Sequence, residues 1–188
     1  MHLKQCVLWL LILLLLSGCS QKTKELETAL ALRSNILQSQ ECSFETNITA
    51  DYGDYISSFV MNCTGDSNGN LIFAVTEPTS ISGISGSITG EGGQLLFEDT
   101  ALHFPLLADE QLSPVSGPWF FLKSLRGGYI TSACTEDGSV YLSIDDSYET
   151  DSLRLDIKMN ELNLPVHADI LYNGRRIMTL DVRNFSIL

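Results

Sequence analysis

Apolar and polar side chains alternate along most of the chain beyond residue 42. Residues 140–145, 153–159 and 166–172 each place an apolar side chain at nearly every second position. Such alternation is typical of antiparallel strands with one buried face and one solvated face. Hairpin-turn sequences separate the stretches, at residues 67–70, 90–93, 137–138 and 173–174. The pattern therefore predicts about nine to eleven strands in a large antiparallel meander, with a weaker, bulged strand at residues 79–90.

A different spacing precedes the first strand. Leu26, Ala29, Leu30 and Ile36 follow the three–four spacing of one helix face. This spacing predicts an amphipathic helix over residues 24–38, with Thr23 as its N-cap. Arg33 lies near the edge of the apolar stripe, where we expect a solvated side chain.

Two short helices are expected in the middle of the chain, at residues 106–112 and 118–127. The second has Pro118 at its first position and Gly127 as its stop. It is apolar around most of its circumference, so it must be covered on more than one side. The sequence thus predicts an α+β, mainly β fold. Its core is a large curved antiparallel sheet, a half-open barrel, with helices packed on its concave face.

The first twenty residues have the layout of a secretory signal peptide. A short basic start and an apolar run over residues 6–16 are followed by small residues. The sequence Leu16-Ser17-Gly18-Cys19 resembles the bacterial lipobox, in which the cysteine is acylated and becomes the first residue after cleavage. We therefore expect a signal peptide over residues 1–18, a lipidated tether over 19–24 and a single domain over 25–188. The alternative is a plain signal peptide or membrane anchor with a chance cysteine.

Charge limits the partners that the domain can have. The chain carries 11 Lys and Arg against 23 Asp and Glu, a net charge of −12. No basic cluster is present, which argues against nucleic acid and against a domain lying flat on anionic lipid. We therefore expect the acyl chains on Cys19 to hold the protein at a cell membrane, lipid-anchored and facing outside the cytoplasm.

Three cysteines remain beyond the predicted lipidation site. A hairpin folded at residues 51–54 places Cys42 directly opposite Cys63, close enough for a disulfide in an oxidising compartment. The alternative is that all three cysteines are reduced, buried thiols. Cys134 has no assigned partner.

The order of these elements resembles that of the LolA/LolB-like superfamily of lipoprotein and lipid carriers. An early helix with Leu26, Ala29, Leu30 and Arg33 precedes the first hairpin. The strand over residues 69–78 ends in a proline-containing turn, and a hairpin over 88–97 follows it. The resemblance covers most of the mature chain and implies a sheet that encloses helices and a hydrophobic ligand. No residue matches the arginine that controls the lid of the LolA carrier, so no lid mechanism is carried over.

Catalytic and metal-binding patterns are missing from the sequence. His103 and His167 lie outside metal-ligand spacing of any other histidine or cysteine, and we expect both to be solvated or hydrogen-bonded. No nucleophile motif of a hydrolase occurs. The acidic residues Asp145, Asp146, Glu149 and Asp151 could bind calcium, but a solvated loop is the favoured interpretation. We expect no enzyme activity, no cofactor and no metal.

Two functions follow from these observations. The first is binding of a lipid, an acyl chain or a lipidated protein in the concave face of the sheet. The second is docking of a partner envelope protein by a domain with a filled core. Arg175 and Arg176, after the turn at 173–174, are one option for a lipid head group but fit ordinary turn charges better. The residues expected to line a ligand cavity are Leu30, Phe73, Phe97, Trp119, Phe120, Phe121, Leu122 and Leu125.

Overall fold

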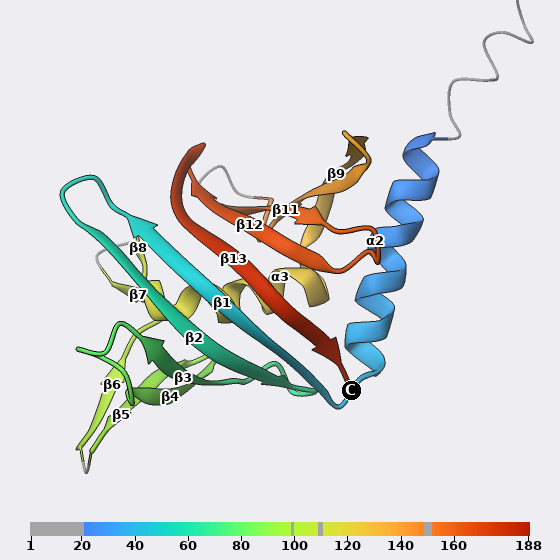
Figure 1. Cartoon of the computed structure of the whole chain (residues 1–188). Coiled ribbons are helices and arrows are strands. Elements are labelled where there is room, and N and C mark those ends of the chain that lie inside the picture. Colours follow the sequence, from blue (N-terminus) through green and yellow to red (C-terminus); the bar gives the residue numbers. More distant parts are fainter. Residues whose placement is uncertain (1–20, 99, 109–110, 149–151) are drawn as a thin grey trace, which may run out of the picture.

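A single curled sheet dominates the protein (Figure 1). The computed structural model describes residues 21–98, 100–108, 111–148 and 152–188. The predicted signal peptide and Cys19 lie outside the described residues. In the described residues the sheet has eleven strands, all antiparallel, and it does not close into a barrel. The predicted fold class, a half-open barrel with helices, is confirmed.

The sheet consists of two meanders that meet at its centre. Its order is β6-β5-β4-β3-β2-β1-β13-β12-β11-β10-β9, so the first and last strands in the chain are neighbours. The bounds of the first meander are β1 Glu41–Asp51, β2 Ile56–Asp66, β3 Leu71–Glu77, β4 Ser85–Thr89, β5 Gly92–Phe97 and β6 Thr100–Phe104. Those of the second are β9 Tyr129–Glu136, β10 Ser139–Asp145, β11 Leu153–Met159, β12 Pro165–Tyr172 and β13 Arg175–Ile187.

The alternating stretches form strands as predicted. In β11, Leu155, Ile157 and Met159 are buried while the residues between them are accessible. In β12, Ala168 and Ile170 are buried in the same way. The turns at 137–138 and 173–174 are two-residue connections, and the first residue of each has a positive φ (Asp137, 49°; Asn173, 49°). Asp, Asn and Gly tolerate this conformation, so the turn residues set the pairing of these strands.

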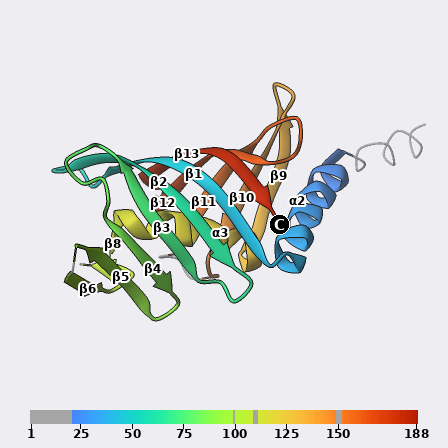
Figure 2. The same ribbon diagram turned by 60° about the horizontal axis from the view of Figure 1, so that its bottom comes forward.

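Two helices accompany the sheet. Helix α2 (Gln21–Gln38) lies beside β9 and begins three residues before the predicted start. Thr23 is therefore inside the helix and not its N-cap. Residues 21–24, which were expected in the tether, belong to α2 as well. Helix α3 (Gly117–Gly127), preceded by the 3-10 turn η1 (Pro114–Ser116), is the predicted apolar helix and packs inside the curl of the sheet (Figure 2).

The helix predicted at residues 106–112 is wrong. These residues form a two-stranded hairpin, β7 (Leu107–Ala108) and β8 (Gln111–Leu112). Ser113 is extended, with φ −58° and ψ 139°, and its N–H donates to the Leu106 carbonyl at 3.0 Å. Pro114 disfavours a helical conformation at the residue before it, so the segment closes as a hairpin before α3 begins.

The predicted register of the first hairpin is also wrong. Cys42 pairs with Gly65 and Cys63 pairs with Phe44, because Asp51 pairs with Ile56 around a turn centred one residue later than expected. The two cysteines share the buried face but are diagonal neighbours. Diagonal residues lie about 7–8 Å apart, beyond the Cα separation of about 4.4–6.8 Å in most disulfides. Cys42, Cys63 and Cys134 are free thiols, the first two buried and the third exposed.

Among the described residues, neither helix combines the length and the apolar character that a membrane-spanning helix needs.

Candidate functional site

The concave face of the sheet holds most of the residues expected to line a ligand cavity. Five of them lie on α3 and are at most 8% exposed: Trp119, Phe120, Phe121, Leu122 and Leu125. Phe73 on β3 is buried in the same hydrophobic core. Leu30 on α2 and Phe97 on β5 are about half exposed, at 47% and 49%. The fold therefore brings six of the eight residues together and leaves two outside.

The interior around α3 is filled by side chains. The ring of Phe121 packs edge-on against Phe44 of β1 and Phe185 of β13, with centroids 5.5 and 6.2 Å away. The close approach of α3 to the sheet requires glycine at two positions, Gly65 on β2 and Gly117 on α3. A Cβ at Gly65 would lie 2.5 Å from Leu122 Cδ1, and one at Gly117 would lie 2.2 Å from Met178 Sδ. The helix thus fits the sheet without spare room at these contacts.

The space left beside α3 is small. Between Trp119, Leu122, Ile36 and Leu71 it measures about 10 Å³. A single water needs about 10–15 Å³ by this kind of measure, so no acyl chain fits there. In this structure six of the eight predicted cavity residues fill a core, and Leu30 and Phe97 lie outside it.

Polar contacts fix α3 to the turn between β2 and β3. The indole Nε1 of Trp119 donates to the Gly69 carbonyl at 3.0 Å. Arg126, in the last turn of the helix, donates to the backbone carbonyls of Asp66, at 2.9 Å, and Ser67. One side of α3 is therefore held at both ends by the same short turn.

The carboxylate of Asp66 organises that turn. Its Oδ1 accepts the N–H groups of Asn68 and Asn70, each at 2.9 Å, and its Oδ2 accepts the Asn70 amide at 2.9 Å. Burial by itself would raise the pKa of Asp66, but the hydrogen bonds from Asn70 and Asn68 outweigh it and lower the pKa. The charged form is therefore the one that shapes the turn and presents its carbonyls to α3.

Arg33 fixes the other side of α3. Its guanidinium donates to the carbonyl oxygens of Leu125 (2.8 Å), Gly128 (2.8 Å) and Ser124 (3.3 Å). These carbonyls lie at the C-terminal end of α3, where a cation also meets the negative end of the helix dipole. Partial burial lowers the pKa of Arg33. The expectation of a solvated Arg33 is wrong, because its position beside the apolar stripe faces α3 and not water.

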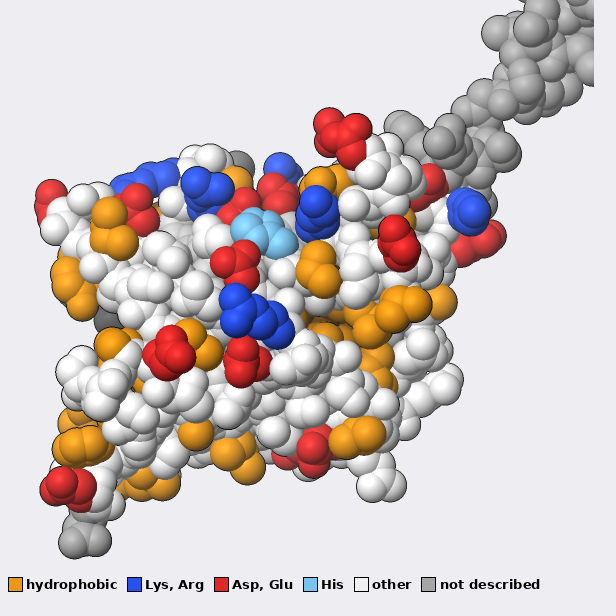
Figure 3. All heavy atoms as spheres, viewed as in Figure 1, with side chains coloured by type: hydrophobic (Ala, Val, Ile, Leu, Met, Phe, Trp, Pro, Cys, Tyr) orange, Lys and Arg blue, Asp and Glu red, His pale blue; other side chains and the backbone are white. Residues whose placement is uncertain are grey.

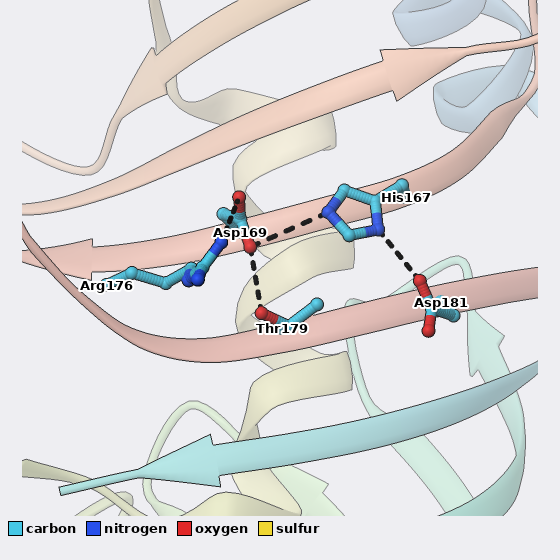
Figure 4. A network of polar contacts seen from close by, with 5 residues as sticks. All are labelled: His167, Asp169, Arg176, Thr179 and Asp181. Carbon is cyan, nitrogen blue, oxygen red and sulfur yellow. Dashed lines mark hydrogen bonds and ion pairs between the residues drawn. The ribbon is translucent and has the colours of Figure 1, made fainter. Parts of the chain in front are cut away.

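A polar network lies on the outer face of the sheet, away from α3 (Figure 4). His167 on β12 contacts Asp181 on β13 through Nδ1 at 2.8 Å and Asp169 through Nε2 at 3.6 Å. Asp169 also accepts from Thr179 at 2.9 Å and lies 3.5 Å from Arg176. The expectation of a hydrogen-bonded His167 is confirmed. The network joins neighbouring strands across an accessible surface.

The acidic loop provides no metal site in the described part of the chain. Asp145 pairs with Arg154 at 2.8 Å, and Asp146 pairs with Lys123 of α3 at 2.8 Å. Glu149 and Asp151 lie outside the described residues. No group of three or more His, Cys, Asp or Glu side chains in the described ranges is arranged to hold a metal ion.

Among the described residues, exposed apolar side chains form patches on α2 and on the β5–β6 hairpin, and Tyr55 and Ile56 are exposed at the start of β2. On α2, Leu26, Leu30 and Leu37 form a stripe of 39–51% exposed residues next to the buried stripe of Ala29, Leu32 and Ile36. At the opposite end of the sheet, Leu96, Phe97 and Leu102 of the β5–β6 hairpin are 43–61% exposed. An open groove of about 550 Å³ runs along this hairpin, past Ser87, Gln94 and His103. Sequence reasoning named Phe97 but missed the hairpin as a surface.

No family model matches this chain, and no curated protein matches it in sequence. Its fold is similar to several solved structures. A putative outer membrane lipoprotein-sorting protein domain from Vibrio parahaemolyticus has a TM-score of 0.47 and 9% identity, over 88% of this chain and 93% of that one. A chain in the structure of the Clostridioides difficile CwlD amidase in complex with the GerS lipoprotein has a TM-score of 0.46 and 13% identity, over 86% of this chain and 95% of that one. A LolA superfamily protein from Nitrosomonas europaea has a TM-score of 0.43 and 13% identity, over 85% of this chain and 93% of that one. Each of these is a likeness of fold at 13% sequence identity or less.

Proposed function

We propose that this chain is an extracytoplasmic lipoprotein, held at a membrane by lipid on Cys19, that docks a partner envelope protein and catalyses no reaction. The observation that supports it is the filled concave face. The apolar side chains of α3 pack against the sheet, and about 10 Å³ remains beside Trp119 and Leu122. A domain with a packed interior and exposed apolar patches has the features of an interaction module.

The competing function is a carrier of a lipid, an acyl chain or a lipidated protein. It would use the same concave face, but α3 occupies that face and is held there by Arg33, Arg126 and Trp119. Binding of an acyl chain would require those contacts to break. The closed packing therefore favours docking of a partner on the outside.

The absence of catalysis is supported by the polar groups that the described residues bring together. His167 is engaged by two carboxylates on an accessible face, and Thr179 donates to Asp169. His167 and Asp169 line an open pocket of about 210 Å³, but the hydrogen bond of His167 goes to the carboxylate of Asp181 and not to a nucleophile.

Native mass spectrometry distinguishes the two functions. The domain is produced without residues 1–20 and purified without detergent, then incubated with envelope phospholipids. We expect the mass of the bare polypeptide before and after incubation. A bound mass that organic extraction removes and that matches a phospholipid or fatty acid would establish the carrier function instead.

Lipidation is tested separately in the producing cell. Replacement Cys19→Ala should move the protein from the membrane fraction to the soluble fraction, because the acyl chains supply the membrane affinity. Cys134→Ala, which changes an exposed thiol in the domain, is the matched control and should remain in the membrane fraction. Membrane retention of the Cys19 variant would show that the protein is held in another way.

A further inference from the structure

Charge is distributed unevenly along this chain. No Lys or Arg occurs between Arg33 and Lys123, a region that contains all of β1–β8. The same region carries the acidic residues Glu41, Glu45, Asp51, Asp54, Asp66, Glu77, Glu91, Glu98, Asp99, Asp109 and Glu110. This half of the sheet thus carries Asp and Glu side chains but no Lys or Arg of its own.

Cations from elsewhere reach part of this region. Arg183 of β13 lies 3.6 Å from Glu45, and Arg175 lies 3.5 Å from Asp51. Farther from the centre of the sheet, Glu77, Glu91 and Glu98 are exposed and take part in no ion pair among the described residues. These three carboxylates surround the β4–β6 end of the sheet and leave its charge uncompensated.

The β5–β6 hairpin extends the apolar face of the sheet. The pairings Phe73–Gly86, Gly86–Leu95 and Leu95–Leu102 continue one face from the buried core outward. Phe73 is 2% exposed, whereas Leu102 on the same face is 61% exposed. Figure 3 shows hydrophobic side chains gathered at the lower left, over β5 and β6, with no basic side chain beside them on that face. The core-facing side of the hairpin therefore continues the core without being covered.

The apolar surface of the hairpin is built on a fixed framework. The ring of Phe104 on β6 lies directly over Gly93 on β5, where an added Cβ would be 2.1 Å from Phe104 Cζ. Gly93 is buried under this ring. The contact packs β6 against β5.

The edge of β6 offers unpaired backbone groups. In the described residues β6 pairs with β5 alone, and it ends the sheet. Phe97 pairs with Thr100 across a two-residue connection, a position at which both residues of the pair exchange hydrogen bonds. Because such pairs alternate along the ladder, Leu102 and Phe104 also bond to β5. The N–H groups of Ala101 and His103 then point away from the sheet.

The other edge of the sheet is different. There, β9 has α2 packed beside it, and Thr135 of β9 donates to Glu25 of α2 at 2.8 Å. Figure 2 shows α2 next to β9 and no helix beside β6. A long-lived exposed strand edge invites pairing with another chain, so a protein that leaves one uncovered has a use for it or is prone to aggregate.

We propose that β6 takes up an extended segment of a partner protein as one further strand of the sheet, and that this segment is basic with apolar side chains at alternate positions. Its backbone would pair with Ala101 and His103. Its apolar side chains would cover Leu102 and Phe97, and its basic side chains would face Glu91 and Glu98. A second copy of this chain is disfavoured as the occupant, since it would bring the same carboxylates to the contact. The inference rests on the proposed docking function and specifies where the partner binds.

The first test uses a defined peptide and the full lipidated chain in detergent. The probe is a fluorescent peptide of about nine residues that alternates valine with lysine, long enough to span a strand. We expect saturable binding at physiological ionic strength. A peptide of the same composition with the valines and lysines in two blocks should bind at least about tenfold more weakly, since it cannot place apolar side chains on one face. Equal binding of both peptides would reduce the effect to charge attraction and overturn the proposal.

Hydrogen exchange of the unaltered protein locates the bound peptide. We expect slower exchange at residues 100–104 when the alternating peptide is added, and unchanged exchange at residues 129–136 of the other edge strand. Protection at β9 and not at β6 would overturn the proposal, as would no protection at either edge. This measurement needs no substitution, so it does not depend on how a variant folds.

Two pairs of variants test the edge and its charge. Ala101→Pro removes an outward N–H without removing a ladder bond to β5, and should weaken peptide binding by about tenfold. Ala133→Pro makes the same change at an outward N–H of β9 and should bind as the unaltered protein does. Glu91→Lys with Glu98→Lys should weaken binding similarly, whereas Glu161→Lys, in the turn before β12, should not. Unchanged binding by Ala101→Pro would exclude strand addition at β6.

A cross-linking experiment separates failure of this inference from failure of the proposed function. A photoreactive residue replaces Ala101, Leu30 or Leu162 in the lipoprotein in its own membrane. A protein cross-linked through position 101 by a basic, extended segment supports the inference. A protein cross-linked through position 30 alone would keep the docking function and overturn the site. Size-exclusion chromatography of the full chain in detergent should give a monomer, and a dimer lost in Ala101→Pro would show that β6 pairs with a second copy.

Discussion

The indole N–H of Trp119 donates to the carbonyl oxygen of Gly69 at 3.0 Å, so the largest side chain of α3 is held by the turn between β2 and β3. Trp119 is 8% exposed and belongs to the core. One residue thus combines apolar packing with a hydrogen bond across elements that are distant in the sequence.

Replacement of Trp119 should measure how much of the stability comes from the filled core. We expect Trp119→Ala to lower the free energy of unfolding by about 3–5 kcal/mol, the usual cost of a large-to-small change in a core. Trp119→Phe keeps most of the apolar bulk and should cost less. Urea denaturation followed by circular dichroism gives both values, with Leu162→Ala, at an exposed turn, as the control. A near-neutral Trp119→Ala would mean that this side chain serves a functional surface.

Arg33 should contribute to stability through the end of α3. Replacement by Met keeps the aliphatic stem but removes the guanidinium donors from the carbonyls of Leu125 and Gly128, whereas the Ser124 carbonyl keeps the N–H of Gly128, so we expect a loss of about 2–3 kcal/mol. Arg183→Met is the matched control, because Arg183 is 67% exposed and makes one 3.6 Å ion pair with Glu45. It should change the free energy of unfolding by less than about 1 kcal/mol. Equal effects of the two replacements would contradict the role assigned to Arg33.

The three thiols should react at different rates. Cys134 is exposed, whereas Cys42 and Cys63 are buried, and burial raises the pKa of the Cys63 thiol. Under native conditions a thiol reagent should modify Cys134 rapidly and leave the other two unmodified until the protein unfolds. Mass spectrometry of the labelled peptides identifies the sites. A disulfide between Cys42 and Cys63 in the native protein would contradict the register of the first hairpin.

The stability should depend on pH through Tyr52. Burial raises the pKa of Tyr52 from 10.0 to about 12, and its hydroxyl donates to the Leu112 carbonyl. The unfolded chain loses this proton near pH 10 and the folded chain does not, so the contribution is complete below pH 10 and is lost as the pH rises toward 12. Tyr52→Phe should be less stable than the unaltered protein at neutral pH, and the difference should shrink above pH 10. A difference that stays constant with pH would show that Tyr52 titrates normally in the folded state.

Much of the fold could be predicted because strands of a sheet with one buried face alternate apolar and polar residues in the sequence. Leu155, Ile157 and Met159 point inward at every second position, and Asp137 and Asn173 mark the turns. The facing of Cys42 and Cys63 was predicted correctly as well, since it depends on odd and even positions. Their register was not predicted, because it depends on the turn around Gly53. Moving the centre of that turn by one residue shifts the register by two positions, which keeps the same faces.

The misplaced contacts have a common cause. Arg33 looks solvated in a helix taken by itself, and its partners are 91–95 residues away in the chain. Residues 106–112 look helical by local composition, but Ser113 and Pro114 end that option. Likewise, exposure of Phe97 and Leu102 follows from how far α3 extends along the sheet, which no local pattern records.

The adjacency of β1 and β13 has a kinetic consequence. Each meander can form from neighbouring strands, but the two become one sheet only when β13 pairs with β1, which joins residues 42–50 to residues 178–187. Contacts between segments so far apart close a long loop and slow folding. Until β13 pairs with β1, the chain therefore carries two half-sheets with an open seam, and its last strand completes the core.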